Sequence, residues 1–110
     1  MITTHVLDTS SGKPGRGIAV ELERAEHGVW HLIGAGITDD DGRLRTLTAE
    51  GDLPEGTYRI RFQVASYFTA RQLDAFYPIV EIQFSVLDGT QHYHVPLLLS
   101  PFGFSTYRGS

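Results

Sequence analysis

The chain has 110 residues, of which 41% are hydrophobic and 20% are charged, and its formal net charge at pH 7 is −4. This length predicts a single domain, residues 1–110, with one hydrophobic core, and a negative chain whose only lysine is Lys13 argues against a nucleic-acid surface. No apolar run approaches the ~18 residues of a membrane span, and the absence of cysteine excludes disulfides and thiolate catalysis.

The first predicted element is a strand at Thr3–Asp8. Because successive side chains in a strand point to opposite faces, His5 and Leu7 share one face and Val6 lies on the other. Residues 10–17, with the sequence SSGKPGRG, are rich in turn-forming residues and predict a loop.

Two further strands are predicted at residues 18–23 and Val29–Thr38, joined by a turn at 26–28. In the first of them, apolar side chains alternate along the chain as in a half-buried strand. The second contains Gly34 and Gly36, which indicate a bulge or a close approach of another backbone. The side chains of this strand that we expect to pack in the core are Trp30, Leu32 and Ile37.

An acidic segment at 39–42, with the sequence DDDG, comes next. A calcium loop of the EF-hand type needs spaced ligands, a distant glutamate and flanking helices, none of which is present. The segment is therefore predicted to be a tight turn in which glycine supplies the positive backbone angle. It directs Arg43 to the start of a strand expected at Arg43–Thr48.

The clearest strand in the chain is Gly56–Ala65, and its predicted partner is Ile79–Leu87, because both alternate apolar with polar side chains. Between them, Ser66–Leu73 lacks strand-like alternation and predicts a short helix capped by Ser66. The outward faces of the two strands carry opposed charges that suit cross-strand pairs: Arg59, Arg61 and Glu81.

The last strand pair has two faces of different character. His92 and His94 share one face, and after a turn at Ser100-Pro101 a second strand is expected at Phe102–Tyr107. The opposite face of the first strand is apolar and consists of Tyr93, Val95, Leu97 and Leu99. Turn signals recur every ~8–12 residues, as in β-sandwiches. We therefore predict an all-β fold, a two-sheet sandwich of about eight strands with one short helix.

Three of the five histidines, His5, His92 and His94, lie on outward strand faces. A His-x-His pair with a third imidazole could bind zinc if the three nitrogens met at ~2.0–2.1 Å from one ion. The same imidazoles suit general acid–base catalysis, because the unperturbed pKa of histidine, ~6.5, lies close to working pH. Spacing alone permits both uses.

The chain resembles the transthyretin-related enzymes that hydrolyse 5-hydroxyisourate in three motifs: HYHVPLLLSPFGFSTYRGS at its end, THVLDTSSGKPG at its start and TDDDGR between them. The resemblance runs from Thr4 to Ser110, and the YRGS ending distinguishes these enzymes from the hormone carrier transthyretin. It implies a transthyretin-like sandwich assembled as a homotetramer, with no metal or cofactor. The implied reaction converts 5-hydroxyisourate to 2-oxo-4-hydroxy-4-carboxy-5-ureidoimidazoline in urate degradation.

The resemblance also implies roles for individual residues. His5 and His94 activate water, and Ser110 orients them through its hydroxyl or its terminal carboxylate. Arg43 matches the substrate-binding arginine, and its rigid fork of donors suits the oxygens of an oxopurine and a developing oxyanion. The remaining candidates are the site-lining His92, the substrate-contacting Tyr107, and Arg108, which either binds substrate or braces the end of the chain.

A different class of function is a transthyretin-like carrier that holds an aromatic small molecule in a tetramer channel. Such a channel is expected to be mostly apolar, whereas His5, Arg43 and Tyr107 would make this one polar and titratable. We expect neither a nucleic acid nor a membrane as partner. The start of the chain lacks the pattern of a secretory signal, which predicts a cytoplasmic protein.

Overall fold

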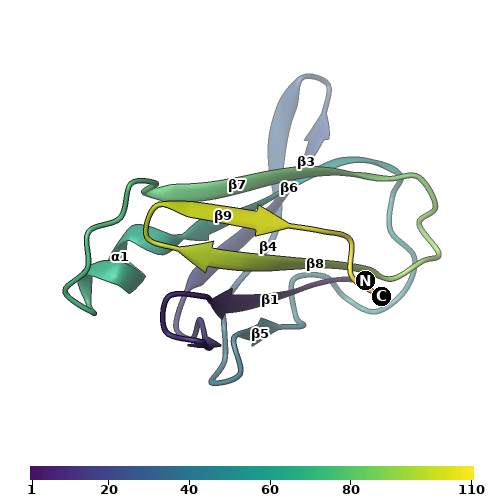
Figure 1. Cartoon of the computed structure of the whole chain (residues 1–110). Helices are drawn as coiled ribbons and strands as arrows, with labels where there is room; N and C mark the ends of the chain where they lie inside the picture. The colour runs from purple at the N-terminus through teal and green to yellow at the C-terminus, as the bar shows by residue number, and fades with distance from the viewer.

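The structure is a computed structural model that describes residues 1–110, and it consists of two facing β-sheets with one short helix (Figure 1). The strands of the first sheet are β1 (Ile2–Asp8), β2 (Lys13–Pro14), β5 (Arg43–Leu44), β8 (Tyr93–Ser100) and β9 (Gly103–Thr106). Those of the second sheet are β3 (Ala19–Glu26), β4 (Val29–Ile37), β6 (Gly56–Gln63) and β7 (Ile79–Val86), and the helix α1 (Val64–Thr69) lies between β6 and β7 in sequence. The predicted all-β, two-sheet sandwich is confirmed.

The first sheet has the strand order β2-β1-β8-β9, with β5 paired to β1, and the second has the order β4-β3-β6-β7. In the first sheet, β1 and β8 run parallel, so that Thr3 lies opposite His94 and His5 lies opposite Pro96. The short strand β5 pairs with β1 on its other side and sets Arg43 opposite His5. These two pairings bring residues from three distant parts of the sequence onto the outer face of one sheet.

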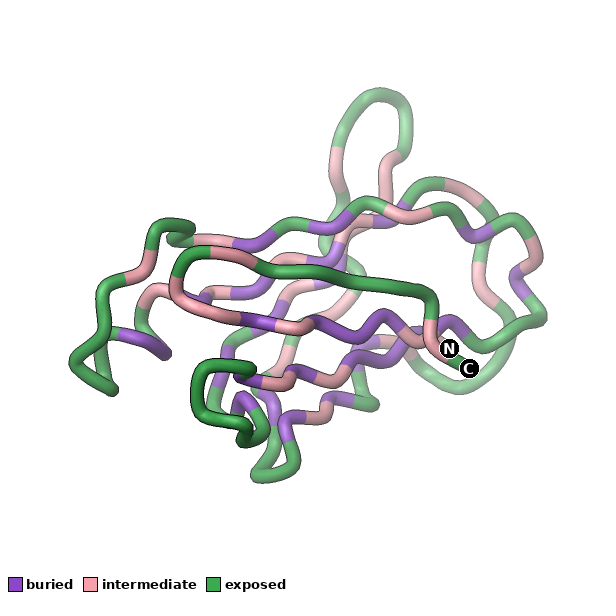
Figure 2. Tube along the Cα trace, viewed as in Figure 1, coloured by how far each residue is buried: buried purple, intermediate pink, exposed green.

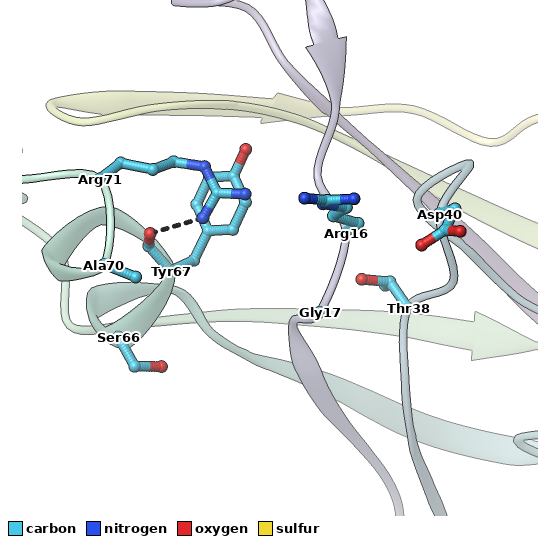
Figure 3. A pocket seen from close by; sticks show the side chains of 8 residues that line it. All are labelled: Arg16, Gly17, Thr38, Asp40, Ser66, Tyr67, Ala70 and Arg71. Carbon is cyan, nitrogen blue, oxygen red and sulfur yellow. Dashed lines mark hydrogen bonds between the residues drawn. The ribbon is translucent and has the colours of Figure 1, made fainter.

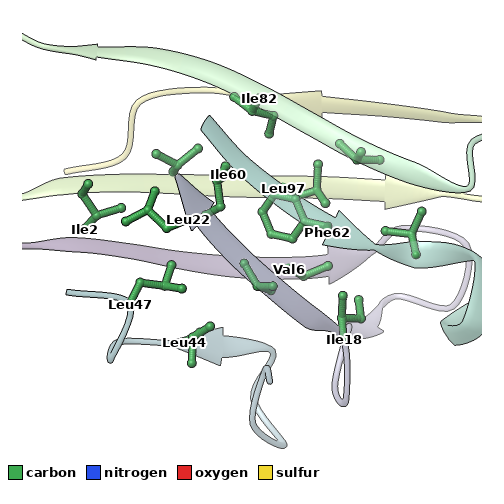
Figure 4. Packing of buried hydrophobic residues seen from close by; sticks show 14 of the residues in the cluster. Ile2, Val6, Ile18, Leu22, Leu44, Leu47, Ile60, Phe62, Ile82 and Leu97 are labelled. Atoms are coloured by element: carbon green, nitrogen blue, oxygen red, sulfur yellow. The ribbon is translucent and has the colours of Figure 1, made fainter. Parts of the chain in front are cut away.

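A cluster of 20 buried apolar residues fills the space between the sheets (Figures 2 and 4). Ile2 and Val6 reach it from β1, and Ile60 and Phe62 reach it from β6 (Figure 4). The predicted inward set on β8 is confirmed, because Tyr93, Val95, Leu97 and Leu99 are all buried. Each such side chain contributes about 1.5–3 kcal/mol when fully buried. The alternation that buries them turns His94 outward.

Strand β4 departs from the expected packing, because Leu32 and Ile37 are 61% and 64% exposed. Its inward positions are occupied by glycines instead. A Cβ on Gly34 would lie 1.9 Å from the Leu47 carbonyl oxygen, and one on Gly36 would lie 2.8 Å from Leu44 Cδ1. The glycines therefore provide the close approach that the sequence indicated. A bulge also occurs in β4: Leu22 lies opposite Gly34 and Glu23 lies opposite Leu32, so Ile33 is the extra residue.

Several element boundaries differ from those predicted. The strand expected at 43–48 is only the two-residue β5, and the loop expected at 10–17 contains the short strand β2. The helix begins at Val64, two residues before Ser66, and the Ser66 side chain does not cap it. The chain leaves the β6 register at Gln63, so the helix starts on an apolar residue that is itself buried. No helix is long and apolar enough to cross a membrane.

The outer face of the second sheet carries a network of ion pairs. Arg61 Nε lies 2.9 Å from a carboxylate oxygen of Glu81, its direct partner across the β6–β7 pair, which confirms one predicted cross-strand pair. Arg59 lies 3.8 Å from Glu81 and 2.8 Å from Glu23 on β3. The network joins three strands. Its exposed pairs contribute only about 0.2–1 kcal/mol each, whereas the Arg59–Glu23 pair is partly buried.

A buried carboxylate ties the first sheet to the helix. Asp8 is 1% exposed and accepts a hydrogen bond of 2.7 Å from the Tyr67 hydroxyl as well as bonds from Ser10 and Ser11. Burial raises the pKa of Asp8, but the hydrogen bonds from Ser10 and Tyr67 outweigh it, so the pKa lies below its ordinary value. Burial also raises the pKa of Tyr67, to about 12.

Replacing Tyr67 with phenylalanine should therefore lower the free energy of unfolding by about 1.5–3 kcal/mol at neutral pH, because a buried charge loses a hydrogen-bond donor. Denaturant unfolding measures the change. Tyr77→Phe is the matched control, since the Tyr77 hydroxyl makes no hydrogen bond within the protein and its loss should be neutral. Equal stability of the two variants would contradict this assignment.

Candidate active site

The acidic turn at residues 39–42 positions two candidate site residues, Arg43 and His5. Asp39 accepts hydrogen bonds from the backbone N–H groups of Arg43 and Asp41, at 3.0 and 2.9 Å, and these bonds lower the pKa of Asp39. Gly42 takes a φ of 76°, as predicted for a tight turn. The Asp41 carbonyl oxygen then accepts a bond of 2.9 Å from His5 Nε2. Because a carbonyl only accepts, His5 carries its proton on Nε2 and leaves Nδ1 as an acceptor.

The two C-terminal histidines are linked through a threonine of β1. The Thr3 hydroxyl lies 2.8 Å from His92 Nε2 and 2.8 Å from His94 Nδ1. A hydroxyl has one proton, so it donates to one imidazole and accepts from the other. When His94 donates from Nδ1 to Thr3, and Thr3 donates to His92, the Nε2 atom of His94 is left free to accept a proton. The three side chains therefore form a relay with a base at one end.

The end of the chain folds back over His94. The Gly109 backbone N–H donates to the His94 carbonyl oxygen at 2.8 Å. Ser110 follows and lines a cavity of about 220 Å³ together with both C-terminal histidines. The full lining of this cavity is Met1, Thr3, Thr4, Arg43, Arg45, His92, His94 and Ser110. Met1 and Ser110 lie close together where β1 and β8 begin (Figure 1).

The surroundings of His94 favour its neutral form. Partial burial lowers the pKa of His94, and the positive charge of Arg43 lowers it further, with smaller effects from His5 and His92. His94 is therefore neutral at neutral pH and able to accept a proton. Arg43 on β5 and His5 on β1 thus act on His94 together with His92, although His5 does not line the cavity itself.

The other two candidates lie in an adjoining hollow. Tyr107 and Arg108 line a second cavity of about 250 Å³, which also contains His94. Arg108 donates to the Gln91 side-chain oxygen at 2.8 Å, and its guanidinium carbon lies 4.6 Å from the centre of the Tyr93 ring. In this position Arg108 braces the end of the chain against β8.

Four residues of the cavity were missed by sequence reasoning, Met1, Thr3, Thr4 and Arg45, and two of them, Thr3 and Arg45, bear on the chemistry. Thr3 shares its strand face with His5, and Arg45 lies two residues after Arg43, as residues on one strand face do. The alternation of side chains along a strand could therefore have pointed to both residues. What the sequence lacked was the parallel β1–β8 pairing that sets Thr3 opposite His94. No group of three or more histidine, aspartate or glutamate side chains is placed to hold a metal ion.

Gly109 offers a direct test of the contact between the chain end and His94. A Cβ at Gly109 would lie 2.6 Å from His94 Cδ2, so Gly109→Ala should displace the imidazole or the chain end and lower turnover by about tenfold or more, in line with the sensitivity of catalysis to small misplacements. Gly103→Ala is the matched control, because its Cβ would meet only Ser100 Oγ, at 3.7 Å. Unchanged activity in Gly109→Ala, measured beside that control, would rule out the contact.

The chain belongs to the HIUase/Transthyretin family, whose sequence profile matches residues 2–109. The resemblance seen in its three motifs is thereby confirmed.

The proteins that resemble this chain include both hydrolases and a transthyretin. The 5-hydroxyisourate hydrolase of Halalkalibacterium halodurans is 46% identical over 115 residues, which cover 99% of this chain and 97% of that protein. The structure of the Klebsiella pneumoniae 5-hydroxyisourate hydrolase has a TM-score of 0.86 at 32% identity and covers 99% of this chain and 98% of its own. Sea bream transthyretin in complex with thyroxine has a TM-score of 0.92 at 31% identity, covering 98% and 93%. The fold therefore does not separate the two functions.

Proposed function

We propose that the protein hydrolyses 5-hydroxyisourate. The observation that carries the proposal is the cavity in which a relayed histidine base, His94, lies beside the guanidinium of Arg43. Hydrolysis of a ring amide requires a base for water, a cation for the developing oxyanion and an acid for the leaving nitrogen. These groups are present on one sheet face. One 5-hydroxyisourate hydrolase is 46% identical in sequence, and another, at 32% identity, shares the fold.

The first step is attack of water on a ring carbonyl. His94 Nε2 accepts a proton from the water as its oxygen bonds to the carbonyl carbon. Thr3 accepts a hydrogen bond from the Nδ1–H group of His94 and donates one to His92. This chain holds the tautomer of His94, much as the third member of a catalytic triad holds its base. His5 is held by the Asp41 carbonyl, which leaves Nδ1 free to act on substrate or water from beside the cavity.

The second step is collapse of the tetrahedral intermediate. Arg43 stabilises the oxyanion through its fixed charge and its planar donors, and Arg45 adds a second positive charge at the cavity. The C–N bond then breaks, and the His94 imidazolium returns its proton to the departing ring nitrogen. The product is a ring-opened carboxylate, 2-oxo-4-hydroxy-4-carboxy-5-ureidoimidazoline.

The remaining candidates support this chemistry. Ser110 borders the cavity, where its hydroxyl or a carboxylate orients the imidazoles, and Tyr107 contacts the part of the substrate that extends toward the second hollow. Arg108 keeps the chain end in place rather than binding substrate directly. We assign no metal or cofactor to the reaction.

A carrier of an aromatic ligand is the rival function. The cavity argues against it, because seven of its eight lining residues are polar and only Met1 is apolar. A carrier site for such a ligand is expected to be mostly apolar. Turnover separates the two functions: 5-hydroxyisourate generated by urate oxidase should lose its ultraviolet absorbance faster in proportion to the protein added. A decay rate independent of protein, with ligand bound but unchanged, would favour the carrier.

We also propose that the protein acts as a homotetramer in urate degradation. The edge strands β7 and β9 end their sheets without a partner, and large apolar side chains near them are exposed, among them Phe76, Leu87, Phe102 and Tyr107. Pairing with further copies would cover both the edges and this apolar surface. Light scattering after size exclusion tests the assembly. Location in the cytoplasm remains a prediction from the sequence.

A further inference from the structure

The largest hollow in the structure lies away from the candidate active site. It has a volume of about 510 Å³ and borders a second hollow of about 420 Å³, and the two share Arg16, Asp40 and Arg71. Neither shares a residue with the cavity around His94. Figure 3 shows Arg71 and Tyr67 at one side of the larger hollow, Asp40 at the other, and Arg16 between them.

The basic side chains that line the two hollows form no ion pair with an acidic side chain of the protein. Of the nine lysine and arginine residues, Arg24, Arg59 and Arg61 form ion pairs with glutamates. Arg43, Arg45 and Arg108 border the candidate active site. The remaining three are Lys13, Arg16 and Arg71, which line the two hollows. None of these three has a carboxylate within 4.0 Å, and Asp40 is the one acidic residue that lines the two hollows. A chain with a net charge of −4 therefore carries a net positive surface here.

Arg71 is held in place without an acidic partner. Its guanidinium carbon lies 3.6 Å from the centre of the Tyr67 ring, and Nη1 donates to the Tyr67 carbonyl oxygen at 2.9 Å (Figure 3). Tyr67 is itself fixed by its hydrogen bond to the buried Asp8. Stacking uses the face of the guanidinium and one bond uses one of its five N–H groups, so the remaining donors are pre-positioned for a ligand.

Arg16 is the second arginine with free donors beside Arg71. It lines the same hollow, and its side chain makes no hydrogen bond within the protein. Two guanidiniums with free donor edges match the oxygens of a carboxylate or a phosphate, which arginine binds with two parallel hydrogen bonds. Asp40 and the negative net charge of the chain would repel an extended polyanion. The arrangement therefore selects a small anion.

We propose that Arg16 and Arg71 form a binding site for a small oxyanion, a carboxylate or a phosphate, with Lys13 at its rim. Asp40 faces the site and limits the charge that it accepts. The site is separate from the proposed catalytic cavity, and its existence does not depend on the hydrolase activity.

Isothermal titration with two probes, inorganic phosphate and glycolate, tests the site at constant ionic strength. We expect at least one probe to bind with a Kd of about 1 mM or below, and Arg16→Gln to weaken that binding about tenfold or more through loss of a charge-assisted pair. Asp40→Asn should tighten binding, because it removes a repelling charge. Arg61→Gln, which removes the same charge from the second sheet, is the matched control and should bind like the wild type.

Each outcome of the titration decides the proposal. Binding of phosphate alone or of glycolate alone assigns the site to that class of ligand, and binding of both assigns it to oxyanions in general. If neither probe binds at concentrations up to about ten times the expected Kd, the proposal is wrong. Binding that Arg16→Gln leaves unchanged means an adventitious ion only. Arg16 contacts no partner through hydrogen bonds or ion pairs, so its variant should unfold at the wild-type temperature.

Discussion

Replacing His94 with glutamine is expected to lower kcat/KM for 5-hydroxyisourate by about 10²–10⁴-fold, the range that a positioned general base contributes. Glutamine keeps a polar side chain of similar reach that can still bond to Thr3, but it cannot accept a proton from water. The lowered pKa of His94 makes it the histidine best prepared for that role at neutral pH. Thermal unfolding should change little, because the imidazole is only half-buried.

His31→Gln is the matched control for this variant. His31 is an exposed histidine on β4 of the other sheet, and its replacement should leave kcat/KM unchanged. A His94→Gln protein with near-normal activity would remove His94 as the base. The role would then pass to His5, whose Nδ1 is free to accept a proton.

Replacing Arg43 with lysine should lower kcat/KM by about 10²-fold or more, as loss of an oxyanion donor does in other hydrolases. Lysine keeps the charge but replaces the planar fork with a single ammonium group, which cannot bond to two neighbouring oxygens in fixed geometry. The backbone of Arg43 is fixed by Asp39, so the lysine would start from the same position in the turn.

Arg61→Lys is a suitable control, because Arg61 forms exposed ion pairs on the second sheet and its replacement should leave activity intact. Steady-state kinetics of the two variants give the comparison. A normal rate in Arg43→Lys would mean that Arg45, which lines the same cavity, provides the oxyanion contact instead.

Much of the fold could be predicted from local pattern. The alternation in β6 and β7 identified both strands and their pairing, because each buries one face and exposes the other. The same rule failed on β4, where glycines occupy the inward positions and Leu44 and Leu47 arrive from another segment to cover them. A periodicity rule cannot foresee side chains that come from elsewhere in the chain.

The sequence predicted several residues of the candidate site, but not the hydrogen bonds that link them. Strand alternation put His5 and His94 on outer faces, and the tight turn correctly directed Arg43 to the start of β5. The relay through Thr3 depends on the parallel register of β1 and β8, which are separated by most of the sequence. Long-range register is set by the whole core and leaves no local signal.

The measurement that tests the central claim most directly is the pH dependence of kcat/KM for protein dialysed against a strong chelator. A histidine base with a lowered pKa remains neutral until the pH falls below the ordinary pKa of histidine, near 6.5, so activity should decline only on the acid side of that value. Because the mechanism uses no metal, activity should also survive chelation. Activity that is lost on chelation and restored by zinc, or that already declines above pH 6.5, would contradict a metal-free mechanism based on His94.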